Sequence, residues 1–175
     1  MTIKKQLAIL LVCLLTLCLT ACGNDNNSSN KSALDNLEPN DTVALAGVDV
    51  GKGFIDINIS VSPGETDAAM GKLLLYLDVI KQTYHGLEDQ GTPANIIIAF
   101  RGMAVTLVTN EASDELKAAV SELEGLGIKF EACSIATNLF GVDNANILAE
   151  IKVVGNTFIS AIGYQAKGYS PILIQ

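Results

Sequence analysis

The stretch Asn95-Ile96-Ile97-Ile98-Ala99-Phe100 decides the fold class of this 175-residue chain. After its first residue it is a continuous apolar run of strand length, and a strand is apolar on both faces only where both faces are covered. Such strands are typical of the centre of a parallel sheet that carries helices on each side. The stretch therefore predicts an α/β fold.

Segments with helical periodicity lie on both sides of this run. Apolar residues recur at helical spacing over residues 66–84, and Gly86 is the expected helix stop. After the run, Ser113 is suited to cap a helix that ends near Glu124. The sequence therefore places one helix before the central strand and one after it.

Further strands and helices continue the alternation. The remaining expected elements are strands over residues 54–61, 128–134, 151–154 and 170–174, and helices over residues 143–150 and 156–167. Pro171 lacks the N–H that a central strand must donate, so the last strand is expected at a sheet edge. This order predicts a three-layer α/β/α domain over residues 51–175, with a mainly parallel sheet of about five strands.

The first 21 residues have the features of a bacterial export signal. Lys4 and Lys5 precede an apolar run over residues 7–19, which is too short to span a bilayer. The stretch Leu19-Thr20-Ala21-Cys22 resembles a lipobox, in which the cysteine is lipidated before cleavage ahead of it. We therefore expect a lipoprotein signal peptide over residues 1–21 and a lipid on Cys22. The alternative is an ordinary secretory signal.

A lipid on Cys22 would attach the protein to a membrane of the cell envelope. Residues 22–50 begin with a stretch rich in Asn, Ser and Asp, which predicts a flexible polar tether. Gly23 rather than Asp follows the cysteine. By resemblance to Gram-negative lipoproteins, we expect the outer membrane rather than the inner one, with the domain facing the periplasm. In a cell with a single membrane it would lie on the outer face.

Charge and composition exclude several classes of partner. Removal of the signal leaves nine basic and 19 acidic residues, a formal charge of −10. A surface with this excess of negative charge repels nucleic acid and anionic lipids. We therefore expect no nucleic-acid partner, and membrane attachment through the lipid on Cys22. One histidine and one remaining cysteine cannot build a closed zinc site, so neither a metal nor a cofactor is expected.

Cys133 is the one thiol that signal removal and lipidation leave free. It ends a predicted strand, and ligands of parallel sheets bind beyond the carboxyl ends of the strands. Arg101 and Gly102 follow a second strand, and Gly155 and Asn156 follow a third, so we expect these segments to share one crevice. A guanidinium and a helix N-terminus there favour an anion or a thiolate. The alternative is a cysteine that is buried and inert.

Several short stretches resemble the DsrE/DsrF-like family. They are Ile96-Ile97-Ile98-Ala99-Phe100-Arg101-Gly102, residues 122–133 with the end Gly127-Ile128-Lys129-Phe130-Glu131-Ala132-Cys133, Val153-Val154-Gly155, and Gln165-Ala166-Lys167-Gly168-Tyr169. The resemblance runs from about Phe54 to the C-terminus and implies a three-layer α/β/α domain that forms dimers, trimers or hexamers.

The same resemblance implies a role for Cys133. In the sulfur-relay members of the family, a cysteine at the matching position carries persulfide sulfur. Two features depart from the family pattern. Many members have a histidine where this chain has Arg101, and the relay members work in the cytoplasm, where an exported domain does not reach their tRNA substrate.

Two functions therefore remain open. In the first, the protein accepts or transfers sulfur in the cell envelope: Cys133 is the acceptor, Arg101 stabilises the thiolate or a bound anion, and backbone amides near Gly155 and Asn156 hold the terminal sulfur. Its partners would be a sulfur donor or small thiol ligand and further copies of the chain. In the second, the protein is a non-enzymatic, oligomeric lipoprotein that binds a ligand or partner, and Cys133 is inert.

Overall fold

The computed structural model describes residues 34–175, in which one compact unit runs from Glu38 to Gln175. The predicted signal peptide, Cys22 and part of the predicted tether lie outside the described residues. In the described part of the predicted tether, Thr42–Leu45 form a 3-10 helix, η1. Within residues 34–175, no helix has the length and apolar character needed to span a bilayer.

Five parallel strands form the sheet. They are β1 (Gly51–Ile57), β2 (Ala94–Phe100), β3 (Lys129–Cys133), β4 (Ile151–Val154) and β5 (Ser170–Ile174). Their order is β4-β3-β2-β1-β5, and every neighbouring pair is parallel. The apolar run quoted above is β2, the central strand, and Pro171 lies on edge strand β5. The predicted α/β class is confirmed.

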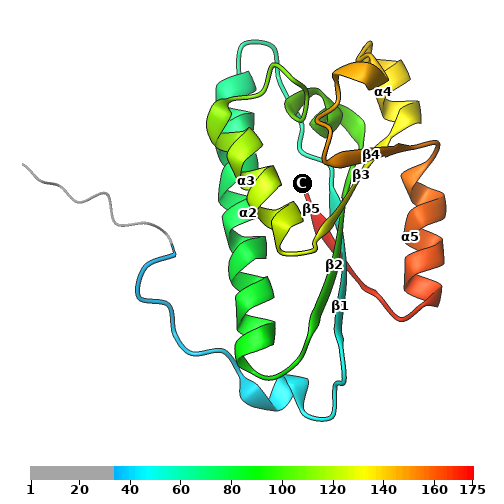
Figure 1. Cartoon of the computed structure of the whole chain (residues 1–175). Helices are drawn as coiled ribbons and strands as arrows, with labels where there is room; N and C mark the ends of the chain where they lie inside the picture. The colour runs from blue at the N-terminus through cyan, green and yellow to red at the C-terminus, as the bar shows by residue number, and fades with distance from the viewer. Residues whose placement is uncertain (1–33) are drawn as a thin grey trace, which may run out of the picture. The chain divides into compact units, whose positions relative to one another are not determined.

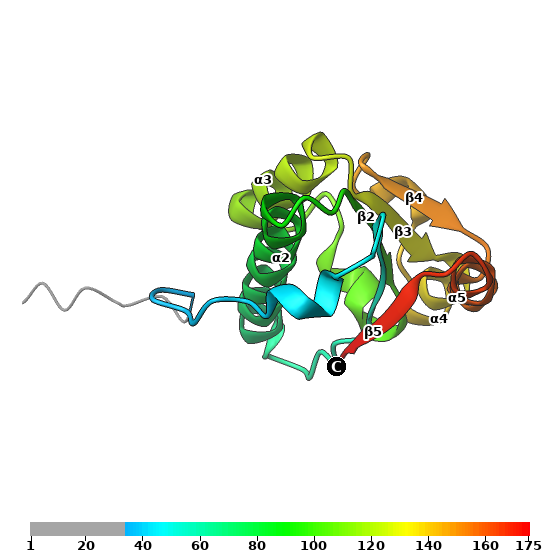
Figure 2. The same cartoon turned by 90° about the horizontal axis from the view of Figure 1, so that it is seen from below.

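Helices cover both faces of this sheet. The helices α2 (Thr66–Asp89) and α3 (Asp114–Gly125) lie on one side, and α5 (Thr157–Ala166) lies on the other (Figure 1 and Figure 2). The short helix α4 (Ser134–Phe140) lies near the end of the sheet where the strands finish (Figure 1). The chain therefore has the three-layer arrangement that the sequence predicted.

The two faces of the sheet carry different side chains. The large core lies on the side of α2 and α3, and buried Ile55 of β1 and Ile98 of β2 belong to it. On the α5 side, the buried apolar residues form a small cluster of Phe54, Ile97 and Ala99. Because side chains alternate along a strand, polar residues follow that cluster on the same face. Asp56 and Arg101 come two residues after Phe54 and Ala99, and Glu131 is opposite Ala99 in the strand register.

Two predicted boundaries were wrong. Helix α2 continues past Gly86 to Asp89, because Leu87 packs against the large core and this contact outweighs the weak helix propensity of glycine. Strand β1 starts at residue 51 and ends at Ile57 rather than spanning 54–61. It ends where its neighbours β2 and β5 end, so the buried residues that follow it have no strand to pair with.

The region after β3 also differs from the sequence prediction. The helix expected over residues 143–150 is only the 3-10 turn η3 (Asn144–Asn146), and α4 forms before it. The chain leaves η3 in extended conformation because it pairs with the loop that contains Val108 and Thr109. Ile147 forms an antiparallel β-bridge with Thr109, and the N–H of Leu148 donates to the carbonyl of Val108. These bonds to another loop replace the helical ones.

Candidate functional site

Cys133 stands at the junction of a strand and a helix. It is the last residue of β3 and the N-cap residue of α4. Its side chain is buried, with 6 % exposed, yet it lines a cleft of about 250 Å³ at the carboxyl ends of the strands. The thiol is therefore shielded from bulk water but borders a space that a small molecule can enter.

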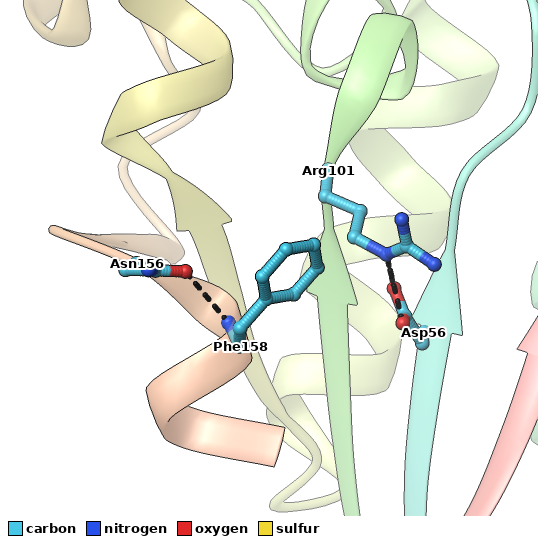
Figure 3. Close-up of polar contacts among 4 residues, drawn as sticks. All are labelled: Asp56, Arg101, Asn156 and Phe158. Atoms are coloured by element: carbon cyan, nitrogen blue, oxygen red, sulfur yellow. Dashed lines mark hydrogen bonds and ion pairs between the residues drawn. The ribbon is translucent and has the colours of Figure 1, made fainter. Parts of the chain in front are cut away.

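Four of the five residues predicted for the crevice lie around this cleft. Arg101, Gly102, Cys133 and Asn156 line it, whereas Gly155 does not. The side chain of Asn156 caps α5 by accepting a hydrogen bond of 2.9 Å from the N–H of Phe158 (Figure 3). The apolar wall of the cleft comes from α4 and α5. Its large side chains are Ile135, Leu139, Phe140 and Phe158.

The surroundings of the Cys133 thiol lower its pKa. Burial by itself raises the pKa, but hydrogen-bond donors around the sulfur outweigh it: the N–H of Thr157, the N–H of Ala136, the hydroxyl of Thr157 and the N–H of Ile135. The amide donors belong to the first turns of α4 and α5, where N–H groups lack partners within the helix. The thiol thus faces two helix N-termini, an arrangement that favours the thiolate.

Thr157 is the candidate site residue beside Cys133 that sequence analysis missed. It is 2 % exposed, and its Oγ1 has no hydrogen-bond partner within residues 34–175. A buried hydroxyl without a partner is uncommon, because it loses its bonds to water. This hydroxyl is available to donate to a thiolate or to a ligand atom in the cleft. Its place directly after the helix cap Asn156, at a strand end, was the signal that could have identified it.

Arg101 is held by an acidic residue of the neighbouring strand. Its Nε donates to both carboxylate oxygens of Asp56, at 2.6 and 2.8 Å, and both side chains are about four-fifths buried (Figure 3). The ring of Phe158 projects from the start of α5 toward the guanidinium, whose central carbon lies 5.4 Å from the ring centre. The remaining guanidinium nitrogens carry no hydrogen bond within the described chain, so they can still bind an anion.

Gly102 shapes the loop after β2. Its backbone is in the left-handed region, with φ of +56°, and a Cβ atom there would collide with the side-chain oxygen of Asn58. Both features require glycine at this position. Gly102 therefore sets the path of the chain directly beside Arg101, which is a positioning role.

Comparison with known proteins gives a family and several similar folds. A model of the DsrE/DsrF-like family matches residues 58–172. A protein of unknown function from Methanobacterium thermoautotrophicum has a TM-score of 0.57 and 22% identity, over 69% of this chain and 96% of that one. At this identity the structural likeness supports the fold alone.

Two further solved structures have lower TM-scores. For the ychN protein of E. coli the TM-score is 0.49 with 9% identity, over 70% of this chain and 99% of that one. A conserved protein of unknown function from Bacteroides thetaiotaomicron has a TM-score of 0.46 with 23% identity, over 69% of this chain and 94% of that one. No curated protein is significantly similar in sequence.

Replacing Gly102 tests its positioning role. We expect Gly102→Ala to lower the free energy of unfolding by about 1–3 kcal/mol, because alanine meets both the left-handed backbone and Asn58. Chemical denaturation of the two proteins measures the difference. The matched control is Gly71→Ala, an exposed position in α2 with open space around it, where alanine should stabilise by up to about 1 kcal/mol. Equal effects at the two positions would contradict the assignment.

The lowered pKa of Cys133 predicts its pH-dependent reactivity. Alkylation by iodoacetamide should reach half its maximal rate at a lower pH in the folded protein than in the unfolded one, because the folded state stabilises the thiolate. By linkage, this stabilisation is present above the pKa of the unfolded thiol and is lost as the pH falls through the folded pKa. Mass spectrometry of the peptide that carries Cys133 measures the rate.

A substitution at Thr157 tests the cause of this shift. Thr157→Val removes one donor, so the pKa of Cys133 and the midpoint of the alkylation profile should rise. The control is Thr83→Val, which removes an exposed hydroxyl on α2 and should leave the midpoint unchanged. A folded-state midpoint at or above that of the unfolded protein would refute the thiolate assignment.

Proposed function

This chain belongs to the DsrE/DsrF-like family, and we propose that it is a sulfur-handling member of that family in the cell envelope. In this proposal Cys133 accepts sulfur as a persulfide and passes it on. The observation that carries the proposal is the lowered pKa of a thiol that borders a cleft between two helix N-termini. A thiolate is the form of cysteine that attacks sulfur.

The sulfur transfer conserves atoms and electrons, so it needs no added oxidant or reductant. The Cys133 thiolate attacks the outer sulfur of a donor persulfide, R–S–SH, and a new S–S bond forms. The S–S bond of the donor breaks, and its electron pair leaves on the donor thiolate, R–S⁻. The product is a persulfide on Cys133, and passing the sulfur to an acceptor thiolate repeats the same exchange in the opposite direction.

The cleft offers support for each part of this step. The N–H groups of Ile135, Ala136 and Thr157 stabilise the attacking thiolate. In this proposal the unpaired nitrogens of Arg101 bind an anionic group of the donor, while Asp56 holds the guanidinium in position. In this scheme Thr157, rather than Gly155, supplies the donors nearest to the sulfur.

Attachment and location belong to the same proposal. A lipid on Cys22 would hold the domain at a membrane of the cell envelope, facing the periplasm, with residues 22–50 as the connection. A sulfur donor in that compartment, as a small thiol compound or a protein persulfide, would then be the partner. The excess of acidic residues in the sequence supports a partner other than nucleic acid.

An exposed apolar patch favours a second function, in which the domain acts as an oligomeric binding protein. We define the patch as Ile135 and Leu139 of α4 and Phe158, Ile159 and Ile162 of α5, all more than half exposed. Large side chains gathered this way on a surface mark an interaction site. The patch borders the Cys133 cleft, so a second copy of the chain that packs on the patch would also form one wall of the cleft.

Sulfur loading tests the main proposal. The full chain is incubated with glutathione persulfide, and the peptide that carries Cys133 is analysed by mass spectrometry after the persulfide is blocked. We expect this peptide to gain one sulfur atom, and we expect Cys133→Ser to gain none there. The Thr157→Val variant should take up sulfur more slowly at neutral pH, because a smaller fraction of its Cys133 is thiolate. Wild-type protein that gains no sulfur at Cys133 would favour the inert binding protein instead.

The oligomer is tested at the apolar patch. We expect Ile162→Glu to shift the protein toward monomer, because burying a carboxylate against an apolar partner face is costly. Light scattering after size-exclusion chromatography measures the mass. The matched control is Val43→Glu, at an equally exposed apolar side chain on η1 that lies outside the patch. A wild-type monomer, or equal behaviour of the two variants, would rule out this interface.

A further inference from the structure

Glu131 is a buried carboxylate that the proposed sulfur chemistry leaves unused. It lies on β3, two residues before Cys133, and is 8 % exposed. Its Oε1 accepts a hydrogen bond of 3.4 Å from the hydroxyl of Tyr164, which is longer than usual for such a bond. Its Oε2 is buried and has no hydrogen-bond partner within the described chain. A buried carboxylate oxygen without a partner is energetically costly, so a hydrogen-bond donor from outside the chain would stabilise it.

The unpaired oxygen belongs to a residue that lines a polar cleft beside β3 and β4. The cleft has a volume of about 360 Å³, and Tyr164 of α5 lines it opposite β3. It has no lining residue in common with the Cys133 cleft. Burial, followed by the charge of Glu131, raises the pKa of Tyr164. Its hydroxyl therefore remains a donor to Oε1, and Oε2 stays buried without a partner.

Two lysines stand beside this carboxylate without pairing with it. Lys152 of β4 is directly opposite Glu131 in the strand register, and Lys129 precedes Glu131 by two residues on the same face of β3. Both line the cleft, together with exposed Glu124 and Glu150. The side chains of these four residues make no hydrogen bond or ion pair with another residue between 34 and 175. The cleft thus offers a buried anionic acceptor with cationic groups next to it.

This pattern of charge selects the ligand. A simple amine would satisfy Oε2 of Glu131, with Glu124 and Glu150 nearby, but would leave Lys129 and Lys152 without an anionic partner. A simple carboxylate would suit the lysines but would be repelled by Glu131, Glu124 and Glu150 and would leave Oε2 without a donor. A molecule that carries an ammonium and a carboxylate a few bonds apart satisfies both at once.

We propose that this cleft binds a small zwitterion of the amino-acid type. The ammonium group donates to Oε2 of Glu131, and the carboxylate lies against Lys152 and Lys129. Tyr164 holds the Glu131 side chain in position through Oε1. This site is separate from the proposed sulfur transfer and does not depend on it.

Three matched probes test the charge pattern on the full wild-type chain. L-Serine has both groups, ethanolamine lacks the carboxylate, and 3-hydroxypropionate lacks the ammonium. Isothermal titration calorimetry should show binding of L-serine. Each of the other two probes should have a dissociation constant at least about tenfold higher, because each loses one charged hydrogen bond. No binding of L-serine at millimolar concentration, or equal binding of L-serine and either analogue, would overturn the proposal.

Two variants then assign the groups. Glu131→Gln keeps the shape but removes the charge, so its affinity for L-serine should fall about tenfold or more. Lys152→Met should lower the affinity for L-serine and leave that for ethanolamine unchanged or improved. The control is Glu111→Gln, at an exposed glutamate outside the cleft, which should bind as the wild type does. Wild-type affinity in Glu131→Gln would refute the site, and the wild-type probe series decides the matter if this variant does not fold.

Discussion

Burial of β2 on both faces is the constraint from which the rest of the structure follows. A strand with no polar face must have a strand on each edge and a helical layer on each side, and the chain provides this with parallel crossovers. Parallel strands end at one edge of the sheet. Arg101 and Cys133, which are far apart in sequence, are thereby brought to the same cleft.

The two faces of the sheet differ in how much apolar surface they bury and in which polar residues they carry. The face under α2 and α3 buries the large core, whereas the opposite face has a small apolar cluster and one ten-residue helix. Polar side chains are tolerated on that second face because α5 supplies partners: Phe158 for Arg101 and Tyr164 for Glu131. Both candidate sites therefore include polar residues of the face that contributes less to the core, namely Arg101 and Glu131.

Local patterns sufficed for the elements whose signals are local. The apolar run of β2 and the caps Ser113 and Asn156 identified the central strand and two helix starts. The helix α4 was missed because Ile135 and Leu139 face outward, so its apolar residues do not form a stripe toward the core. Helical periodicity with a buried apolar stripe, the signal that identified α2 and α3, is therefore absent from α4.

The site was harder to predict than the fold because its chemistry depends on pairs across strands. Sequence analysis gave Arg101 the task of stabilising the thiolate or a bound anion, but strand order puts Asp56 beside it, and the ion pair offsets much of its charge. What favours the thiolate is then a set of backbone amides from two helix starts, together with Thr157. Backbone donors have no residue signature, so the location of Cys133 at a strand end could be inferred from the sequence while the cause of its lowered pKa could not.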